Sequence, residues 1–507
     1  MNKFMNALKQ ENNKTLTENG AVTYKSTLNG LLDLFAMGGA YRSRSEDDCI
    51  HLFNKAYGED EAYALKCLFY LRDVRGGQGE RRFFRTVTHW LANSHTTSMK
   101  RNLQYVPEFG RWDDLYSFVG TPLEKEAFKL MKHQLALDVD CKTPSLLAKW
   151  LKSENTSSAD SRLLADKTRR YLNMTHKQYR KTLSTLRERI RVVERLMSAG
   201  RWDEIEFDKI PSRAGLIYKN AFARRDIIKE KYKSFAMNQN TTVNAKALYP
   251  YEVVHQAMQF NGSSWFYNTN QGPDSEVNRA MINKYWDNLE DFFNGCTFNG
   301  MAVVDTSGSM YGTPMEVAIS LGMYCAEHNH GPFANHFYTF SNNPTFTEVE
   351  GYDFVDKVTR MAQADWGGST NVEAVFDDML DIAKRTRCSQ EDIPETLIII
   401  SDMEFNACAV GGPRQRDRWM MGRSNHGADE TLFETIERRW NDAGYKMPNL
   451  VFWNVDARHD NIPMRVEGHV SFVSGFSPVL FEQVLKGKTA YDLMYDKLDS
   501  ERYACIH

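Results

Sequence analysis

The chain has 507 residues, 42% of them hydrophobic and 25% charged, and its 63 Lys and Arg nearly balance 66 Asp and Glu, leaving a formal net charge of −3. This composition is typical of a soluble globular protein and excludes disordered and collagen-like chains. A membrane-spanning chain is also excluded, because no run approaches the roughly 18 consecutive apolar residues that a transmembrane helix needs. The length predicts roughly two to four domains. The first residues lack the apolar core of a signal peptide, so we expect no secretion by that route.

The eight cysteines are scattered along the chain, and no two of them form a Cys-x-x-Cys pair. A zinc ribbon and a disulfide framework are therefore not expected. Reduced thiols in a cytoplasmic protein are the simpler interpretation.

Up to about residue 290 the sequence has helical periodicity broken by short turns. Segment 59–94 predicts two helices around the glycines at 76–79, which follow no β-strand and so indicate a helix-ending turn, not a phosphate loop. Gly-Arg-Trp-Asp-Asp-Leu at 110–115 recurs as Gly-Arg-Trp-Asp-Glu-Ile at 200–205. In each copy we expect Gly to end one helix and Trp to pack the next against its neighbour. Recurring helix pairs predict an α-solenoid of HEAT-like repeats.

Positive charge is concentrated in the second half of this helical region. Residues 161–233 hold 20 Lys and Arg against 9 Asp and Glu, an excess of 11, so the remaining chain sums to −14. Between 182 and 197 apolar residues recur every three or four positions, which predicts one amphipathic helix with arginines on its other faces. A solvated face explains a single such helix, whereas some seventy residues of one sign indicate binding to a polyanion.

A nucleic acid such as RNA is a polyanion of this kind: Lys and Arg would neutralise its phosphates, and aromatic side chains such as Tyr179 or Tyr218 would stack on single-stranded ends. The candidate RNA-contacting residues are Arg180, Lys181, Arg187, Arg189, Arg191, Arg195, Arg213, Lys219, Arg224 and Arg225.

From about residue 298 strands alternate with helices. The predicted strands are 298–305, 335–341, 396–402, 449–456 and 469–474, and the predicted helices include 314–329 and 369–385. Alternating βα units predict a parallel sheet in a doubly wound α/β domain, with apolar strands covered on both faces. We expect three parts: an N-terminal arm at 1–25, an α-helical repeat domain at 26–295 and an α/β domain at 296–507.

Polar side chains gather where the carboxyl edge of this sheet is expected, which is where open α/β sheets bind ligands. They follow the first strand, precede the helix at 369–385 and follow the strand at 396–402. Two carboxylates and three hydroxyls without His or Cys favour Mg²⁺ or Mn²⁺ over zinc. The alternative is that the aspartate and serines after the first strand cap the following helix. The predicted metal ligands are Asp305, Ser307, Ser309, Thr370 and Asp402.

A catalytic site would need a general base and an activated nucleophile beside the metal. Glu404 and His426 are close in sequence, but no nucleophile spacing accompanies them. We therefore expect Glu404 to be a supporting residue and the protein not to be an enzyme. The Gly- and Arg-rich insertion at 406–428 forms either a lid over the metal or a solvated loop; its arginines are Arg414, Arg416, Arg418 and Arg423.

The set Asp-x-Ser-x-Ser, Thr and Asp resembles the metal-ion-dependent adhesion site of von Willebrand factor A domains. A helical half followed by this motif resembles the TROVE-module proteins, of which the Ro autoantigen is the best known, and above all an uncharacterised Ro-like group of phages, giant viruses and plants. Besides the metal motif, the segments that carry this resemblance are 17–20 (TENG), 31–38 (LLDLFAMG), 71–81 (LRDVRGGQGER), 106–115 (VPEFGRWDDL), 145–151 (SLLAKWL), 201–214 (RWDEIEFDKIPSRA) and 221–226 (AFARRD).

The resemblance implies a ring or horseshoe of helical repeats closed by the A domain, with a basic surface for structured small RNAs and single-stranded RNA ends. It also implies that the hydroxyls bind the metal directly or through water, that the aspartates supply charge, and that a partner's carboxylate completes the coordination. Met403 stands where glycine often follows the last aspartate. We thus expect a cytoplasmic RNA-binding scaffold (in the host cytoplasm if viral). The alternatives are a metal-dependent protein-interaction module without RNA binding, and a metal-dependent hydrolase.

Overall fold

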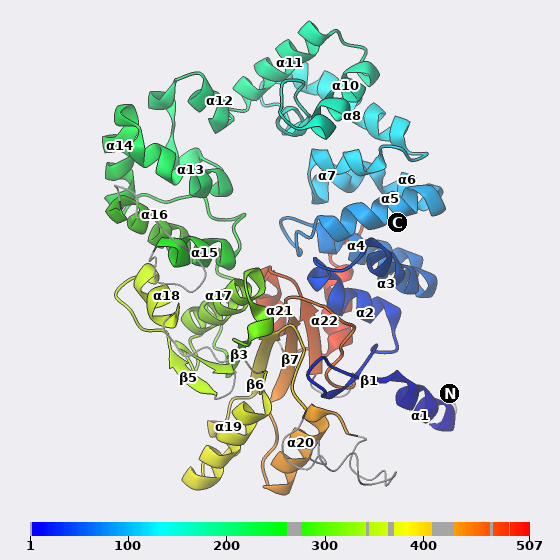
Figure 1. Cartoon of the computed structure of the whole chain (residues 1–507), viewed down its shortest axis with the longest axis vertical. Coiled ribbons are helices and arrows are strands. Elements are labelled where there is room, and N and C mark those ends of the chain that lie inside the picture. The colour runs from blue at the N-terminus through cyan, green and yellow to red at the C-terminus, as the bar shows by residue number, and fades with distance from the viewer. Residues whose placement is uncertain are drawn as a thin grey trace. The chain divides into compact units, whose positions relative to one another are not determined.

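The computed structural model describes residues 3–260, 275–340, 344–362, 370–407, 430–466, 470–485 and 487–507. The chain forms two compact units (Figure 1). One consists of Met1–Ala64, Leu248–Gln271 and Leu289–Ser500, and the other of Leu65–Ala247, Gly272–Asn288 and Glu501–His507. We call them the sheet unit and the helical unit. They confirm the predicted combination of a helical region with an α/β region.

The sheet unit is built on six strands in the order β5-β4-β3-β6-β7-β8, parallel except for β5, which is antiparallel to β4. All five predicted strands are present, with ends shifted by no more than two residues. β5 was not predicted, because it is a short edge strand whose side chains are mostly exposed. The strands are β3 (Gly300–Asp305), β4 (His336–Phe340), β5 (Thr345–Glu348), β6 (Thr396–Ser401), β7 (Asn449–Asn454) and β8 (Val470–Ser474).

Helices cover both faces of this sheet. Because successive residues of a strand point to opposite faces, neighbouring residues of one strand pack against different helices. On one face Trp453 of β7 packs on Phe481, whose ring also stacks on Tyr324 of α17. On the other face Phe452 packs edge-on against Phe433 of α20, and α19 packs against α20. These helices are α17 (Thr313–His328), α18 (Phe354–Ala362), α19 (Glu373–Thr386), α20 (Leu432–Asp442), α21 (Phe481–Val484) and α22 (Ala490–Leu498).

The close approach of α17 to the sheet depends on Gly322. A Cβ atom at this position would lie 2.5 Å from Cγ2 of Val304 in β3. Glycine therefore lets the helix pack on the centre of the sheet.

The N-terminal residues and one later helix also belong to the sheet unit. α2 packs against β8 and α22, and α15 packs against α17 and α18. The predicted boundaries at residues 25 and 295 therefore differ from the compact units, since segments from within 26–295 bury their apolar faces on the α/β region. These elements are α1 (Lys3–Asn13), β1 (Lys14–Leu16), β2 (Val22–Tyr24), α2 (Gly30–Met37), α3 (Glu46–Glu59) and α15 (Pro250–Phe260).

The helical unit consists of consecutive helices that pack on one another, such as α5 with α6 and α13 with α14. Among the helices that the structure describes, none combines the length and apolar character needed to cross a membrane. The longer helices of the unit are α4 (Glu61–Arg72), α5 (Arg82–Ser94), α6 (Thr96–Asn102), α8 (Glu124–Asp140), α10 (Ala159–Tyr171), α11 (His176–Arg189), α12 (Val193–Ser198), α13 (Ser212–Arg224), α14 (Asp226–Met237) and α16 (Ser275–Asp287).

The glycines at 76–79 lie in the turn between α4 and α5, as predicted. The prediction of one continuous helix over 182–197 is wrong. α11 ends at Arg189 and α12 begins at Val193, because Arg191 between them adopts a left-handed conformation with φ of 48°. The apolar spacing continues across the break, so the periodicity alone does not reveal it.

Candidate metal centre and basic surface

The carboxyl ends of β3 and β6 meet where the strand order of the sheet reverses. The chain passes from β3 to β4 on one side and later returns to β6 on the other. Asp305 is the last residue of β3, and Asp402 directly follows β6. Open α/β sheets bind ligands in the crevice at such a point. The prediction that these two carboxylates share this edge is confirmed.

Asp305 is fully buried and held by its neighbours. Its Oδ1 accepts a hydrogen bond of 2.9 Å from the Ser307 backbone N–H, and its Oδ2 accepts one of 2.5 Å from the Ser401 hydroxyl. The hydroxyl oxygens of Ser307 and Ser309 lie 3.0 Å apart. A carboxylate and two hydroxyls are thus fixed in the loop after β3.

Asp402 is also buried, and only one of its oxygens accepts a hydrogen bond. Oδ1 accepts a hydrogen bond of 3.1 Å from the Glu404 backbone N–H. Oδ2 has no hydrogen-bond partner among the described residues. Leaving a buried acceptor unsatisfied costs about 1–3 kcal/mol, so this oxygen has the environment of an atom that needs a ligand.

Burial dominates the electrostatics of the two aspartates. The pKa of Asp305 is raised to about 7, mainly by burial and further by the negative charge of Asp402, while hydrogen bonds from Ser401 and Ser307 oppose the increase. Burial also raises the pKa of Asp402. Two neighbouring buried carboxylates are unfavourable without compensating positive charge, and Arg458, whose Nη2 lies 3.6 Å from Asp402 Oδ2, supplies one such charge. With the serine hydroxyls the two carboxylates form the all-oxygen donor set that Mg²⁺ and Mn²⁺ prefer, so the residues present fit such an ion.

Met403, which follows Asp402, is buried and has a φ of 65°. This is the left-handed region that favours glycine and costs other residues about 1 kcal/mol or more. Met403 therefore adopts a backbone conformation that suits glycine better.

An N-terminal segment lies against the loop that follows β6. We call residues 17–20 the strap. The Thr17 hydroxyl donates to the Phe405 carbonyl at 2.6 Å, and the Ala407 N–H donates to the Asn19 carbonyl at 3.2 Å. The strap thus extends the backbone pairing at this edge of the sheet.

The strap also reaches the third predicted ligand segment. Asn19 Nδ2 donates to the Glu404 carbonyl at 2.5 Å and lies 3.4 Å from the Thr370 hydroxyl. Thr370 is buried, and its carbonyl accepts a hydrogen bond of 3.0 Å from the Asn406 N–H. Thr370 is therefore fixed to the loop that follows Asp402. The glycines at 367 and 368 lie outside the described residues.

Glu404 anchors the strap. Its side chain is fully buried, and its Oε2 accepts a hydrogen bond of 2.7 Å from the Glu18 N–H. Its Oε1 accepts from His459 Nδ1 at 2.9 Å and from Asn461 Nδ2 at 2.7 Å. Ligand atoms of Glu18, Glu404 and His459 lie within 4.8 Å of one another. Because both Glu404 oxygens already accept hydrogen bonds, an anchoring role explains this cluster.

Replacing Glu404 by Gln should destabilise the sheet unit by about 1–3 kcal/mol, because an amide N–H₂ would face donors that now bond to a carboxylate. Urea denaturation measures this change. Glu437→Gln, an exposed position on α20, is the matched control. Equal stability of the two variants would contradict the anchoring role.

Sequence reasoning missed Arg458, which lies beside the candidate ligands. It donates to the Ser309 carbonyl, and its Nη2 lies 3.6 Å from Asp402 Oδ2. Its Nη1 lies 3.7 Å from a carboxylate oxygen of Glu18. Arg458 follows the carboxyl end of β7, so the sheet-edge argument that found the aspartates would also have pointed to it.

Two of the predicted RNA-binding arginines in the helical unit are engaged within the fold. Arg187 donates to the carbonyls of Ala148 and Leu151, each at 2.8 Å. Arg189 donates to the Val139 carbonyl at 2.6 Å. Both side chains hold α11 against the preceding helices.

Other candidates are better placed for a ligand. Arg180, Lys181 and Arg224 are exposed, and the structure gives their side chains no partner among the described residues. Arg213 is also exposed. Arg225 is exposed and lies over the Trp202 ring, with its guanidinium carbon 4.8 Å from the ring centroid.

Lys219 is buried, and this burial lowers its pKa to about 8.

The prediction that Tyr179 stacks on RNA bases is wrong. Its ring is fully buried, and its hydroxyl donates to the Lys152 carbonyl at 2.7 Å. Tyr218 is half-buried, and its hydroxyl donates to Glu194 at 3.3 Å. The proposed lid arginines Arg414, Arg416, Arg418 and Arg423, together with His426, lie outside the described residues.

Comparisons with known proteins match both halves of the chain. Residues 17–160 and 133–292 match the family described as domain of unknown function DUF2828, and residues 299–503 match domain of unknown function DUF7788. An uncharacterized protein of Acanthamoeba polyphaga mimivirus is 32% identical over 522 residues, which cover 94% of this chain and 85% of that protein. The crystal structure of the Deinococcus radiodurans Ro protein aligns with a TM-score of 0.47 and 14% identity, over 94% of this chain and 100% of that chain.

Proposed function

The chain belongs to the family described as domain of unknown function DUF2828, and from its own residues we propose that it is an RNA-binding scaffold carrying a divalent-cation site. The observation that carries the RNA part is the excess of 11 positive charges over residues 161–233. Exposed side chains there, such as Arg180, Lys181 and Arg224, are free of partners within the described chain. Such charge is what a phosphate backbone requires.

The finer form of this proposal is a Ro-like scaffold for structured small RNAs or single-stranded RNA ends. It is supported by the ordered segments of the sequence that resemble TROVE-module proteins, from residues 17–20 to 221–226. The relative from a giant virus fits the uncharacterised group to which the resemblance points. In this proposal the helical unit is a HEAT-like repeat array.

RNA binding should be strong at low salt and fall steeply as salt rises, because lysines and arginines displace the counterions of the phosphates. Filter binding of a single-stranded and a hairpin RNA measures this. We expect micromolar or tighter affinity at about 50 mM salt and a loss of at least about tenfold by about 200 mM.

A matched pair of triple variants tests the surface. Alanine at Arg180, Lys181 and Arg224 should weaken binding, whereas alanine at Lys384, Arg385 and Lys446, exposed residues of the sheet unit, should not. No binding by the unaltered chain even at low salt would exclude the RNA proposal.

The second part of the proposal is that the sheet unit is a von Willebrand A-like module that holds Mg²⁺ or Mn²⁺. The unsatisfied Asp402 Oδ2 beside buried Asp305 supports it most directly. Ser307, Ser309 and Thr370 would provide hydroxyl ligands. When bound, the ion would supply positive charge to attract an acidic group of a partner protein.

We propose a binding role for this site and no catalysis. Glu404, the nearest further carboxylate in the sequence, accepts hydrogen bonds with both oxygens and is not poised as a general base. Incubating labelled RNA with the protein and Mg²⁺ tests this part of the proposal. Intact RNA supports it, and cleavage that is lost in the Asp305→Ala variant would overturn it.

A further inference from the structure

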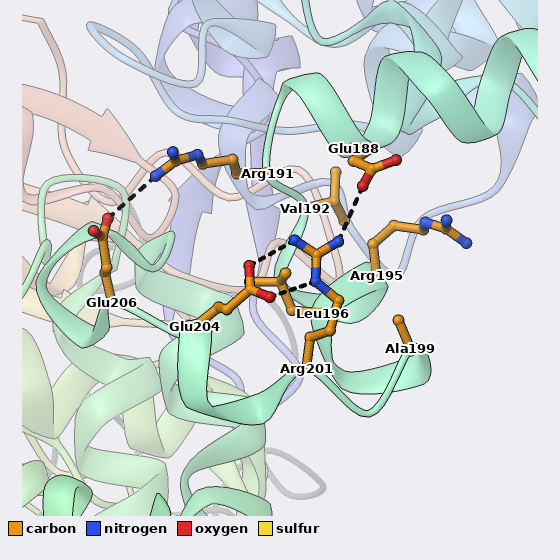
Figure 2. A pocket seen from close by; sticks show the side chains of 9 residues that line it. All are labelled: Glu188, Arg191, Val192, Arg195, Leu196, Ala199, Arg201, Glu204 and Glu206. Atoms are coloured by element: carbon orange, nitrogen blue, oxygen red, sulfur yellow. Dashed lines mark hydrogen bonds and ion pairs between the residues drawn. The ribbon is translucent and has the colours of Figure 1, made fainter.

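The break between α11 and α12 adjoins a cavity of about 460 Å³ in the helical unit (Figure 2). This volume is within the range that holds small ligands. The cavity lies inside the basic stretch and adjoins the second copy of the repeated Gly-Arg-Trp motif. Its lining residues are Glu188, Arg191, Val192, Arg195, Leu196, Ala199, Arg201, Glu204 and Glu206.

The lining combines three kinds of surface. Val192, Leu196 and Ala199 are apolar, and the other side chains are three guanidinium groups and three carboxylates. The formal charges of the lining cancel. A ligand that suits it therefore presents an anionic group, N–H donors and an apolar face together, and a bare inorganic anion does not suit it.

The ion pairs that now occupy the cavity wall are exposed to solvent. Arg201 holds Glu204 through two contacts of 2.6 Å and Glu188 through one of 3.0 Å, and these three side chains are 45–58% exposed. Arg191 Nη1 lies 3.5 Å from Glu206 Oε2. Exposed pairs contribute at most about 1 kcal/mol, so a ligand can exchange with them at little cost.

Arg195 is the arginine of this lining to which the structure gives no partner among the described residues. Its guanidinium points away from the ion pairs drawn in Figure 2. It belongs to α12, whereas Arg191 lies in the break before that helix. Guanidinium groups bind phosphate oxygens through paired N–H donors.

The first copy of the motif shows what these residue types do when their role is structural. Asp114, the counterpart of Glu204, is fully buried and bonds both Arg72 and Arg85, at 2.8 and 2.7 Å. Arg111, the counterpart of Arg201, lies over the Trp150 ring. In the second copy the same positions line a cavity open to solvent.

We propose that this cavity binds one nucleotide of a single-stranded RNA. The phosphate is held by Arg195, the base lies against Val192 and Leu196, and base N–H groups face the carboxylates. The local excess of 11 positive charges favours a polyanion over a basic peptide, and the apolar and carboxylate parts of the lining suit a nucleotide base. The proposal rests on the RNA-binding function proposed above and assigns a site to it.

Photocrosslinking and affinity together test the site. A nonamer of uridine with 4-thiouridine at its centre should crosslink within residues 188–206 of the full chain, as located by mass spectrometry of the digested adduct. Arg195→Ala should weaken binding of the same oligonucleotide by about 5- to 20-fold, because it removes the unpaired phosphate ligand. Arg170→Ala removes an equally basic residue of the same stretch that is 73% exposed and outside the cavity, and should weaken binding less than about twofold.

The possible results separate this inference from the proposed function. If the unaltered chain binds no RNA, the proposed function itself is wrong. If it binds RNA but the crosslinks lie elsewhere and the two variants behave alike, RNA binding stands and the nucleotide site is wrong. Crosslinking of a peptide to 188–206 in preference to the oligonucleotide would also overturn it.

Discussion

Replacing Asp305 and Ser307 together by alanine should abolish binding of Mg²⁺ and Mn²⁺ by the sheet unit and leave RNA affinity unchanged. The change removes one of two buried carboxylates and one of the hydroxyls that converge on the edge of the sheet. Isothermal titration with each ion measures the loss directly. At an ion concentration of 100 times Kd, the unaltered chain should gain about 2.7 kcal/mol of stability that the variant does not gain.

In the presence of EDTA, the same variant tests whether the raised pKa of Asp305 makes the stability of the chain depend on pH. The pKa of Asp305 is raised to about 7 in the folded chain, so between about pH 4 and 7 the folded state binds more protons than the unfolded state. Without metal, the stability of the unaltered chain should therefore fall as pH rises through this window. The variant should lack the part of this decrease in stability that comes from the deprotonation of Asp305.

A second Ser and Asp pair of the sheet unit provides the control. Ser389 and Asp392 form an exposed cap of a short helix, and replacing both by alanine should leave metal binding intact. Equal metal affinity in the Asp305 and Ser307 double variant would show that the ion binds elsewhere or not at all. Loss of RNA affinity in that variant would contradict separate roles for the two surfaces.

The parts of the fold that sequence predicted well are those fixed by local pattern. Buried parallel strands are continuous apolar runs, so β3, β6 and β7 stand out, and their order places Asp305 and Asp402 at one edge. The edge strand β5 was missed because exposed side chains leave no such run.

The missed features depend on contacts between distant residues. The strap joins residues 17–20 to residues nearly 390 positions later, as in the bond from Thr17 to Phe405. No periodicity encodes such a pairing. The break at Arg191 is also hidden, because a non-glycine residue adopts the left-handed conformation there and the apolar spacing continues past it.

Residues of the basic stretch that have similar positions in the sequence differ in their burial. Tyr179 and Arg187 lie in the basic stretch beside exposed Arg180, yet one is in the core and the other bonds to backbone carbonyls. The composition of the stretch therefore predicts its positive charge but not which of its side chains are exposed.

Replacing Asp114 by alanine should destabilise the helical unit by about 3–5 kcal/mol, the largest loss of stability that we expect from a single substitution. Its carboxylate is fully buried and bonds Arg72, which is only 2% exposed, as well as Arg85 and the Arg111 N–H. Without it, the Arg72 guanidinium stays buried with no opposite charge. Urea denaturation of the variant, followed by circular dichroism, measures the change.

The corresponding residue of the second motif copy is the matched control. Glu204 lies ninety positions after Asp114, is 46% exposed and pairs with a 45% exposed Arg201. Glu204→Ala should therefore change stability by no more than about 1 kcal/mol. A large loss in this variant as well would show that both copies serve the core, and the cavity beside Glu204 would then be a packing feature and not a nucleotide site. A large loss at Asp114 alone means that the repeated motif stabilises the fold in its first copy and is available for ligand binding in its second.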